Sequence, residues 1–352
     1  MSATIKPTDS WQHDDIDMII DVRAPAEFAD DHIIGAVNLP VLDDAERAEV
    51  GTLYKQVSPF VARKRGAALV SQNIARHLEQ VLKDKPADFR PLVHCWRGGQ
   101  RSRSIATILA EIGWPCYLLN GGYKAYRAEV MRALEALPAK FQLRIIGGPT
   151  GTAKTRLLHI IAEKGGQILD LEGLAAHKGS LLGADPHHPQ PSQRLFESRL
   201  YASLSALAPD KPVYIEAESA KIGNVQIPKS LWRGMSAAPS VSLSAPLSAR
   251  VAYLLEDYPH LTAQPALFTK LVEGMRHRHG RDCTDKWADS IAQQDWPALA
   301  AALLSDHYDP AYHRSAARHE RPHSWALEMT DCTAPCLHQA AEQILKDACW
   351  AR

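Results

Sequence analysis

The chain has little cysteine, no long apolar run and no excess of charge of either sign. Its cysteines are scattered, at positions 95, 116, 283, 332, 336 and 349 of 352 residues, and this spacing does not predict a disulfide framework. No stretch approaches 18 consecutive apolar residues, so no membrane-spanning helix is expected. The polar start of the chain lacks the apolar segment of a signal peptide, and we therefore expect a cytoplasmic protein.

The charge balance does not indicate a nucleic-acid partner. Lys and Arg together number 40, as do Asp and Glu, so such a partner would need a local basic surface. Hydrophobic residues make up 45% and charged residues 23%, which is ordinary for a globular protein. The length suggests two domains or one large one.

Short apolar strands alternate with amphipathic helices along the chain. In the first part, strands are predicted at 16–22, 91–94 and 116–119, and helices at 67–82 and 101–112. In the second part, strands are predicted at 142–146, 167–171 and 212–216, and a helix at 154–164. This alternation predicts an α/β fold with parallel sheets covered by helices.

A boundary is predicted near 136–141, which gives domains at 12–136 and 140–352. The last hundred residues are predicted to be mostly helical. We expect the cysteines outside the first domain to be structural, at 283, 332, 336 and 349.

Residues 93–104 (VHCWRGGQRSRS) combine a short apolar strand, a cysteine, two glycines and several arginines. The glycines allow the backbone after Cys95 to curl so that N–H groups point inward, and the following helix adds its positive dipole end. Such surroundings lower the pKa of a thiol and suit a tetrahedral anion. We predict Cys95 as the reactive residue, with Arg97 and Arg101 beside it.

Two chemistries fit this loop. His94, Cys95, five further residues and Arg101 match the H-C-x5-R pattern of cysteine phosphatases, in which the arginine holds a phosphoester. The loop also fits a rhodanese-type sulfurtransferase, in which Cys95 carries a persulfide or selenopersulfide. An inert buried cysteine is the third interpretation, which the ordered combination of strand, cysteine, glycines and arginine disfavours.

A second glycine-rich turn, GGPTGTAKT at 147–155, nearly matches the phosphate-binding pattern G-x4-G-K-[ST]. In such a loop Lys154 reaches the terminal phosphate and Thr155 offers its hydroxyl to Mg²⁺. Ala153 stands where the pattern has glycine, and a positive φ there would cost about 1–2 kcal/mol. A plain turn before a helix is the alternative. The predicted phosphate-binding residues are Gly148, Thr150, Gly151, Thr152, Ala153, Lys154 and Thr155.

Acidic partners for a metal ion follow two of the predicted strands. VYIEAES places Glu216 and Glu218 after one strand, and LDLEG places Asp170 and Glu172 after another. A carboxylate at a strand end beside a phosphate loop can hold Mg²⁺ or its waters. The candidate metal ligands are Thr155, Glu216, Glu218 and Asp170, and solvated loop acids are the alternative for each pair.

Residues 21–40 (DVRAPAEFADDHIIGAVNLP) and 118–127 (LLNGGYKAYR) resemble the N-terminal and C-terminal signatures of rhodanese domains. With the cysteine loop, this resemblance spans about 12–136 and favours the sulfurtransferase over the phosphatase. A rhodanese domain followed by a phosphate loop resembles the tRNA 2-selenouridine synthase family over nearly the whole chain. Further segments that carry the resemblance are 51–73, 169–183, 190–198, 215–223 and 307–312.

That resemblance implies an enzyme that replaces sulfur by selenium at C2 of the wobble 2-thiouridine in Lys, Glu and Gln tRNAs. Selenophosphate supplies the selenium, and an S-geranyl nucleoside made from geranyl diphosphate is the implied intermediate. Carried over to this sequence, Cys95 is the selenium-carrying nucleophile and 148–155 the candidate diphosphate site. An enzyme that supplies selenophosphate is an implied partner, no membrane is involved, and no tightly bound cofactor is expected.

Clusters of basic residues are the candidate tRNA contacts. These are Arg63, Lys64 and Arg65 in the first domain, with Arg276 and Arg278 in the second. A solvated basic face is the ordinary alternative for each cluster. Two other functions stay open: a sulfurtransferase or phosphatase fused to a small-molecule kinase-like domain without RNA, and a non-catalytic RNA-binding module with a degenerate phosphate loop.

Overall fold

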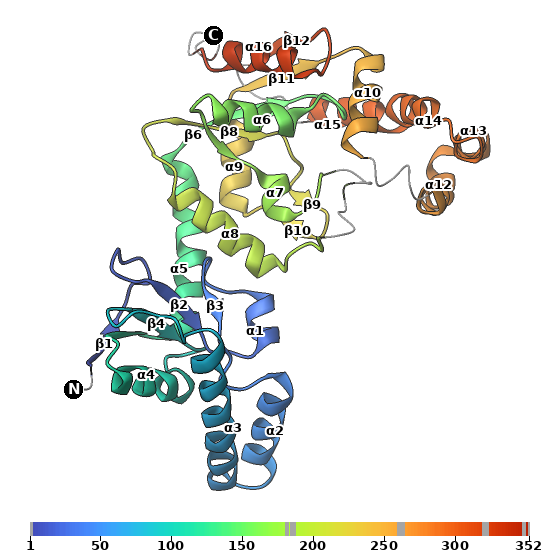
Figure 1. Cartoon of the computed structure of the whole chain (residues 1–352). Coiled ribbons are helices and arrows are strands. Elements are labelled where there is room, and N and C mark those ends of the chain that lie inside the picture. The colour runs from blue at the N-terminus through green and yellow to red at the C-terminus, as the bar shows by residue number, and fades with distance from the viewer. Residues whose placement is uncertain are drawn as a thin grey trace. The chain divides into compact units, whose positions relative to one another are not determined.

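The computed structural model describes residues 3–179, 183, 188–258, 265–318, 324–346 and 350 (Figure 1). The chain forms two compact units. The first comprises Met1–Glu135 with Pro191–Ser203, and the second comprises Ala136–Gln190 with Leu204–Arg352. One division falls in the linker predicted at 136–141, whereas no sequence signal marked the return of residues 191–203 to the first unit. None of the helices described is both long and apolar enough to cross a membrane.

The first unit holds a five-stranded parallel sheet in the order β1-β5-β4-β2-β3. Its strands are β1 (Ile5–Thr8), β2 (Met18–Asp21), β3 (Val37–Asn38), β4 (Pro91–His94) and β5 (Cys116–Leu119). Its helices are α1 (Pro25–Asp30), α2 (Asp44–Gln56), α3 (Pro59–Gln80), α4 (Gln100–Ile112) and α5 (Gly122–Ala136). The predicted strands at 91–94 and 116–119 are confirmed, and β4 lies at the centre of the sheet.

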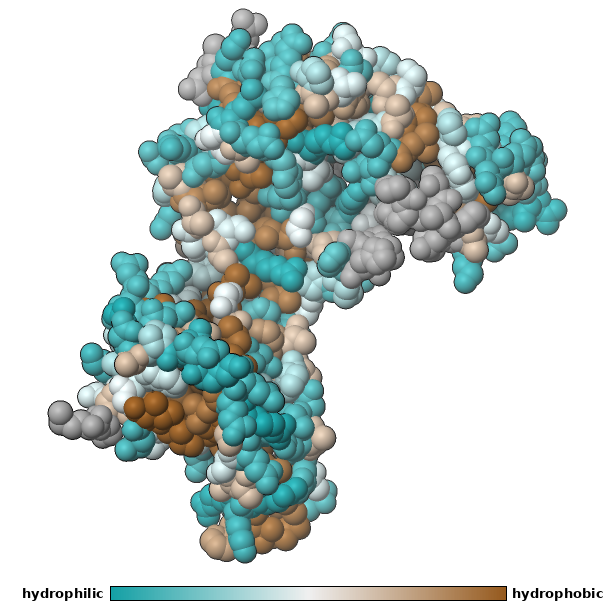
Figure 2. All heavy atoms as spheres, in the orientation of Figure 1, coloured by the Kyte–Doolittle hydropathy of each residue, from teal (hydrophilic) through white to brown (hydrophobic). Residues whose placement is uncertain are grey.

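Helices α2 and α3 form an antiparallel hairpin. The second helix begins eight residues earlier than predicted, because the Ser58 hydroxyl accepts from the Val61 N–H and Pro59 suits the first helical position. Apolar side chains gather on the surface where the two helices meet (Figure 2). They are Tyr54, Val57, Phe60 and Val61, with Phe60 69% exposed.

The second unit holds a five-stranded parallel sheet in the order β12-β11-β6-β8-β7. Its strands are β6 (Gln142–Gly147), β7 (Gln167–Leu169), β8 (Pro212–Glu216), β11 (Ser240–Ser244) and β12 (Ser324–Glu328). The prediction that the last hundred residues are mostly helical is confirmed, and in addition strand β12 within this region forms an edge of the sheet. The α/β fold class is confirmed in both units.

Helices and a small hairpin complete the second unit around this sheet. The helices are η1 (Leu137–Lys140), α6 (Lys154–Glu163), α7 (Leu171–Ala175), α9 (Lys229–Ala237), α10 (Leu247–Asp257) and α16 (Ala334–Ile344), and the hairpin is β9 (Lys221–Ile222) with β10 (Val225–Gln226). Helix α16 packs on α6, and Leu158 and Leu337 are fully buried in their shared core. This packing fixes the helix that follows the phosphate loop.

The remaining helices form a satellite with its own core. They are α12 (Pro265–His279), α13 (Arg281–Ala292), α14 (Trp296–Leu303), the π-helical η2 (Leu304–Tyr308) and α15 (Asp309–Arg318). Trp287 is fully buried among Val272, Ile291 and Leu299. Contacts between α14 and α10 connect this satellite to the rest of the second unit.

Helix α8 (Gln193–Ser205) lies between β7 and β8 in sequence, yet most of it packs with the first unit. Arg127 of α5 bonds to Glu197, and Arg194 pairs with Asp30 at 2.9 Å. The rings of Tyr126 and Tyr201 meet edge to face. Residues 191–203, which interrupt the second unit in sequence, are therefore part of the first unit.

Candidate active site

Cys95 directly follows β4 and begins the loop that leads into α4. Its side chain is 3% exposed. The Gly99 N–H donates to Sγ at 3.2 Å, and the Ser102 hydroxyl lies 3.2 Å from the same atom. Burial alone would raise the pKa of the thiol, but the Ser102 hydroxyl and the backbone N–H groups of Arg97, Ser102 and Gly99 outweigh it and lower the pKa. The loop thus favours the thiolate, which is the nucleophilic form.

The start of α5 closes on the back of this loop. The Tyr123 N–H donates to the Cys95 carbonyl at 2.8 Å, and the Lys124 N–H donates to the Trp96 carbonyl at 3.0 Å. A Cβ atom at Gly122 would meet the Cys95 carbonyl oxygen at 2.2 Å. Glycine is therefore required where the segment LLNGGYKAYR passes the cysteine.

A buried charge network holds α5 in place. Asp21 and Arg23 form an ion pair that is almost completely buried. The Arg23 guanidinium also lies 3.9 Å from the centre of the Tyr123 ring, whose hydroxyl donates to Asp31 at 2.7 Å. The Asn38 amide donates to the carbonyls of Asp21 and Arg23. Residues from the segment DVRAPAEFADDHIIGAVNLP thus fix the helix that supports the cysteine.

Arg101, predicted to stand beside the cysteine, donates instead to Glu27 at 2.7 Å. The phosphatase interpretation needs this arginine for a phosphoester, and here a carboxylate occupies it. His94 is fully buried, which lowers its pKa, and neither ring nitrogen has a hydrogen-bond partner among the described residues. Arg97 lies on the surface of the loop.

The phosphate loop, residues 147–155, follows the central strand β6. Gly148 has φ 149° and Gly151 has φ 85°. Ala153 adopts φ 55° and ψ 33°, the left-handed conformation in which alanine is disfavoured by about 1–2 kcal/mol. No side chain caps the start of α6. The loop therefore keeps a strained residue at Ala153. The first N–H groups of α6 remain available to bind an anion.

Lys154 and Thr155 both bond to protein groups. The Lys154 ammonium donates to the Gly148 carbonyl at 2.9 Å, so it folds back over the loop. The Thr155 hydroxyl donates to Glu172 at 2.8 Å. A bound phosphate would compete for the ammonium, and a metal ion for the hydroxyl.

Glu172, which contacts Thr155, has two further glutamates beside it, Glu216 and Glu218. Glu216 ends β8 and is fully buried, and one of its oxygens accepts from the Glu172 N–H at 3.0 Å. Burial first, then the charge of Glu172, raises the pKa of Glu218 to about 8, although Lys154 acts in the opposite direction. Burial and the nearby Asp170 raise the pKa of Glu216 well above its ordinary range.

Asp170, predicted as a metal ligand, instead caps α7. Its carboxylate accepts from the Gly173 N–H at 2.7 Å and pairs with His159 at 2.9 Å. Glu172, two residues later, reaches Thr155 in its place. Over the part of the chain described, no three or more His, Cys, Asp or Glu side chains form a group that could hold a metal ion. A metal ion would need further oxygens from water or a bound phosphate.

Arg250, which the sequence did not single out, and Cys332, expected only to be structural, both contact the phosphate loop. Arg250 is 5% exposed, donates to the Thr150 carbonyl at 2.8 Å, and forms a bidentate pair with Asp309 at 2.6 and 2.9 Å. The Cys332 thiol donates to the Gly151 carbonyl at 3.5 Å, and burial raises its pKa to about 11. The only sequence signal was Asp309 within the segment HYDPAY.

The other cysteines and the basic candidates are spread over both units. Cys283 and Cys336 are free and partly exposed, and Cys349 lies outside the described residues. Arg63, Lys64 and Arg65 are exposed on α3, and Arg65 pairs with Glu49 at 2.7 Å. Arg276 pairs with Asp285 at 2.7 Å. Arg278 is exposed on α12, where it lines a pocket together with His277 and His307.

Fold and sites define a rhodanese-like domain joined to a phosphate-loop α/β domain. Residues 7–129 match the family model of the rhodanese-like domain. Residues 141–343 match the model described as the tRNA 2-selenouridine synthase AAA domain. The chain belongs to the tRNA 2-selenouridine synthase family.

Relatives of the same family name match much of the chain. The protein of Nitrosomonas europaea is 39% identical over 68% of this chain and 63% of its own length. Those of Shewanella sediminis and Marinobacter nauticus are 32% and 37% identical, each over 84% of this chain and 86% and 87% of their own lengths. A solved domain from Clostridium difficile, of a protein described as ATP/GTP-binding, is 33% identical and covers 36% of this chain and 99% of its own, with a TM-score of 0.32.

Replacing Ser102 by alanine should raise the pKa of Cys95, because the thiolate loses a hydrogen bond. The measurement is the pH dependence of iodoacetamide labelling, followed on the Cys95 peptide by mass spectrometry. Ser104→Ala is the matched control, since that hydroxyl donates to the Arg101 carbonyl and not to the thiol. An unchanged labelling midpoint in Ser102→Ala would refute this account of the thiolate.

Replacing Ala153 by glycine should stabilise the second unit by about 1 kcal/mol, because it relieves a left-handed alanine. The free energy of unfolding in urea measures the change. Ala162→Gly, on the exposed face of α6, should destabilise by about 1 kcal/mol. Destabilisation by both substitutions would mean that the strain at Ala153 does not exist.

Proposed function

We propose that this chain is a tRNA-modifying transferase that converts wobble 2-thiouridine to 2-selenouridine through an S-geranyl intermediate. The family supports the overall conversion, and the substrates are proposed to be Lys, Glu and Gln tRNAs in the cytoplasm. The observation that carries the proposal is the Cys95 loop, in which backbone N–H groups and Ser102 stabilise a thiolate. The same N–H groups suit a tetrahedral anion such as selenophosphate.

The geranyl step is assigned to the phosphate loop. The sulfur of 2-thiouridine attacks C1 of geranyl diphosphate, a C–S bond forms, the C–O bond breaks, and pyrophosphate leaves as the nucleoside loses its N3 proton. Lys154 and the open N–H groups at the start of α6 would stabilise the departing pyrophosphate. An S-alkyl group makes the sulfur a much better leaving group than a thiocarbonyl.

The selenium step is assigned to the Cys95 loop, which we propose to hold selenophosphate and to present its selenium. A C–Se bond forms at C2 of the base, the C–S bond breaks, and geranylthiol departs. Water adds to phosphorus, the P–Se bond breaks, and phosphate leaves. An enzyme that makes selenophosphate is the proposed supplier.

Magnesium is proposed to bind together with the diphosphate. Thr155, Glu172 and Glu218 offer the hard oxygen atoms that Mg²⁺ prefers, and they lie at the mouth of the phosphate loop. Mg²⁺ commonly keeps several waters and takes its other oxygens from phosphate. The described residues alone form no metal-binding group.

The end of the α2–α3 hairpin is proposed as one contact for the tRNA. Arg63 and Lys64 are exposed there, close in sequence to the exposed rings of Tyr54 and Phe60. Cations that meet phosphates and aromatic rings that stack on unpaired bases are a common combination in RNA-binding surfaces. Binding through this surface should weaken as salt concentration rises.

Lys154→Ala should lower the rate of S-geranylation by about a hundredfold, because the developing pyrophosphate loses its point charge. The assay is mass spectrometry of nucleosides from a 2-thiouridine anticodon stem-loop incubated with geranyl diphosphate. Lys164→Ala is the control, since that lysine lies at the far end of α6 and pairs with Glu342. Full geranylation by Lys154→Ala would remove the phosphate loop from this step.

Cys95→Ser should still make the S-geranyl nucleoside and should form no 2-selenouridine when selenophosphate is added. The wild-type protein should form both products in succession. If the wild type, correctly folded, leaves the RNA unmodified under all conditions, the sulfurtransferase or phosphatase without RNA becomes the better interpretation.

A further inference from the structure

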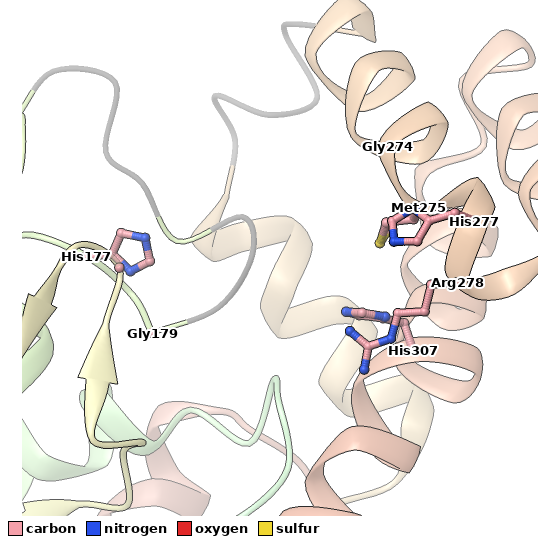
Figure 3. A pocket seen from close by; sticks show the side chains of 8 residues that line it. His177, Gly179, Gly274, Met275, His277, Arg278 and His307 are labelled. Carbon is pink, nitrogen blue, oxygen red and sulfur yellow. The ribbon is translucent and has the colours of Figure 1, made fainter.

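The second unit contains a pocket of about 540 Å³ that no assigned step uses (Figure 3). On one side are His177 and Gly179, which follow α7, and Gly223 between β9 and β10. On the other are Gly274, Met275, His277 and Arg278 of α12, with His307 of η2. We call this the histidine pocket. Its size lies within the usual range of small-ligand sites, about 300–1,000 Å³.

Gly274 is unexpected in its position. It lies within the helix α12, where glycine destabilises the helix relative to alanine. A Cβ atom built on Gly274 would meet no described atom within 4 Å, so the packing around it does not require glycine. A ligand that approaches the backbone of α12 from the pocket would explain the missing side chain.

Arg278 brings a positive charge to the side of the pocket that α12 forms. Arg278 has no ion-pair partner among the described residues, whereas Arg276 on the same helix pairs with Asp285. His279 and His307 share a hydrogen bond of 2.8 Å. Burial, His279, Arg278 and Arg314 together lower the pKa of His307, so this wall resists a further positive charge. An anion would be stabilised here.

The histidine pocket shares a wall with the acidic residues at the phosphate loop. A Cβ atom on Gly179 would lie 2.6 Å from a Glu218 oxygen and 2.9 Å from a Glu172 oxygen. Glu172 in turn accepts from Thr155 of the phosphate loop. A ligand in the pocket would therefore lie next to a diphosphate held by that loop.

We propose that the histidine pocket receives a single unstacked nucleotide of RNA, with its phosphate at Arg278 and its base against the histidine rings. This inference rests on the proposed function, because the bound nucleotide would be the acceptor of the geranyl group. Histidine rings stack on unpaired bases, and arginine binds phosphate. A nucleotide suits this pocket better than a second diphosphate, because the diphosphate already has its own loop and Arg278 supplies a single cation.

Gly274→Leu and Arg278→Ala each test the pocket in the full-length protein. Both should weaken binding of a fluorescent 2-thiouridine anticodon stem-loop at least tenfold, by filling the space and by removing the phosphate contact. Gly274→Leu should keep or raise the melting temperature, because leucine is the better helix former. An unchanged or higher melting temperature together with weaker RNA binding would show that the substitution blocks the pocket and does not damage the fold.

Matched controls lie on the same helix. Glu273→Leu adds a leucine and Lys270→Ala removes a positive charge at exposed positions outside the pocket, and each should change affinity no more than threefold. If Gly274→Leu binds the stem-loop like wild type, or Arg278→Ala behaves like Lys270→Ala, the proposal is wrong.

Binding of inorganic pyrophosphate, measured by calorimetry, distinguishes a nucleotide from a free anion. Gly274→Leu should leave it unchanged, while Lys154→Ala should weaken it. Loss of pyrophosphate binding in Gly274→Leu with RNA binding intact would assign the pocket to the diphosphate and overturn the proposal. These binding assays need no turnover. A wild-type protein that binds RNA at this pocket but never modifies it would therefore contradict the proposed function and leave the pocket proposal standing.

Discussion

The two candidate sites depend on the unpaired backbone N–H groups at the start of a helix that follows a parallel strand from the middle of a sheet. In the first unit β4 leads into α4, and in the second β6 leads into α6. Neither helix has a side chain capping its first turn. Those N–H groups, with the helix dipole behind them, therefore remain available to a thiolate or a phosphate.

Each loop is held in this state by contacts from elsewhere in its own unit. Behind Cys95, the start of α5 comes so close that only Gly122 fits, and the buried Asp21–Arg23 pair fixes that helix. Around the phosphate loop, Arg250 binds a loop carbonyl while Asp309 holds the arginine. The strained Ala153 is tolerated because these contacts over-determine the loop.

The local parts of this arrangement could be predicted from the sequence, and the distant ones could not. Strands, loops and helices adjacent in sequence carry their own pattern, so the cysteine loop, the phosphate loop and the strand at 91–94 were visible directly. Asp170 and Glu172 follow the same strand, so the sequence could not tell which of them reaches Thr155, and only the helix cap formed by Asp170 distinguishes them. Arg250, Cys332 and the placement of α8 depend on tertiary contacts that leave no spacing signal.

The central claim is that the phosphate loop and the Cys95 loop act in succession on one nucleoside. The most direct measurement supplies an anticodon stem-loop that already carries S-geranyl-2-thiouridine, together with selenophosphate, to Lys154→Ala and Cys95→Ser, and follows 2-selenouridine by mass spectrometry. The account predicts that Lys154→Ala converts this RNA at nearly the wild-type rate and that Cys95→Ser does not. Product formation by Cys95→Ser, or none by Lys154→Ala, would contradict it.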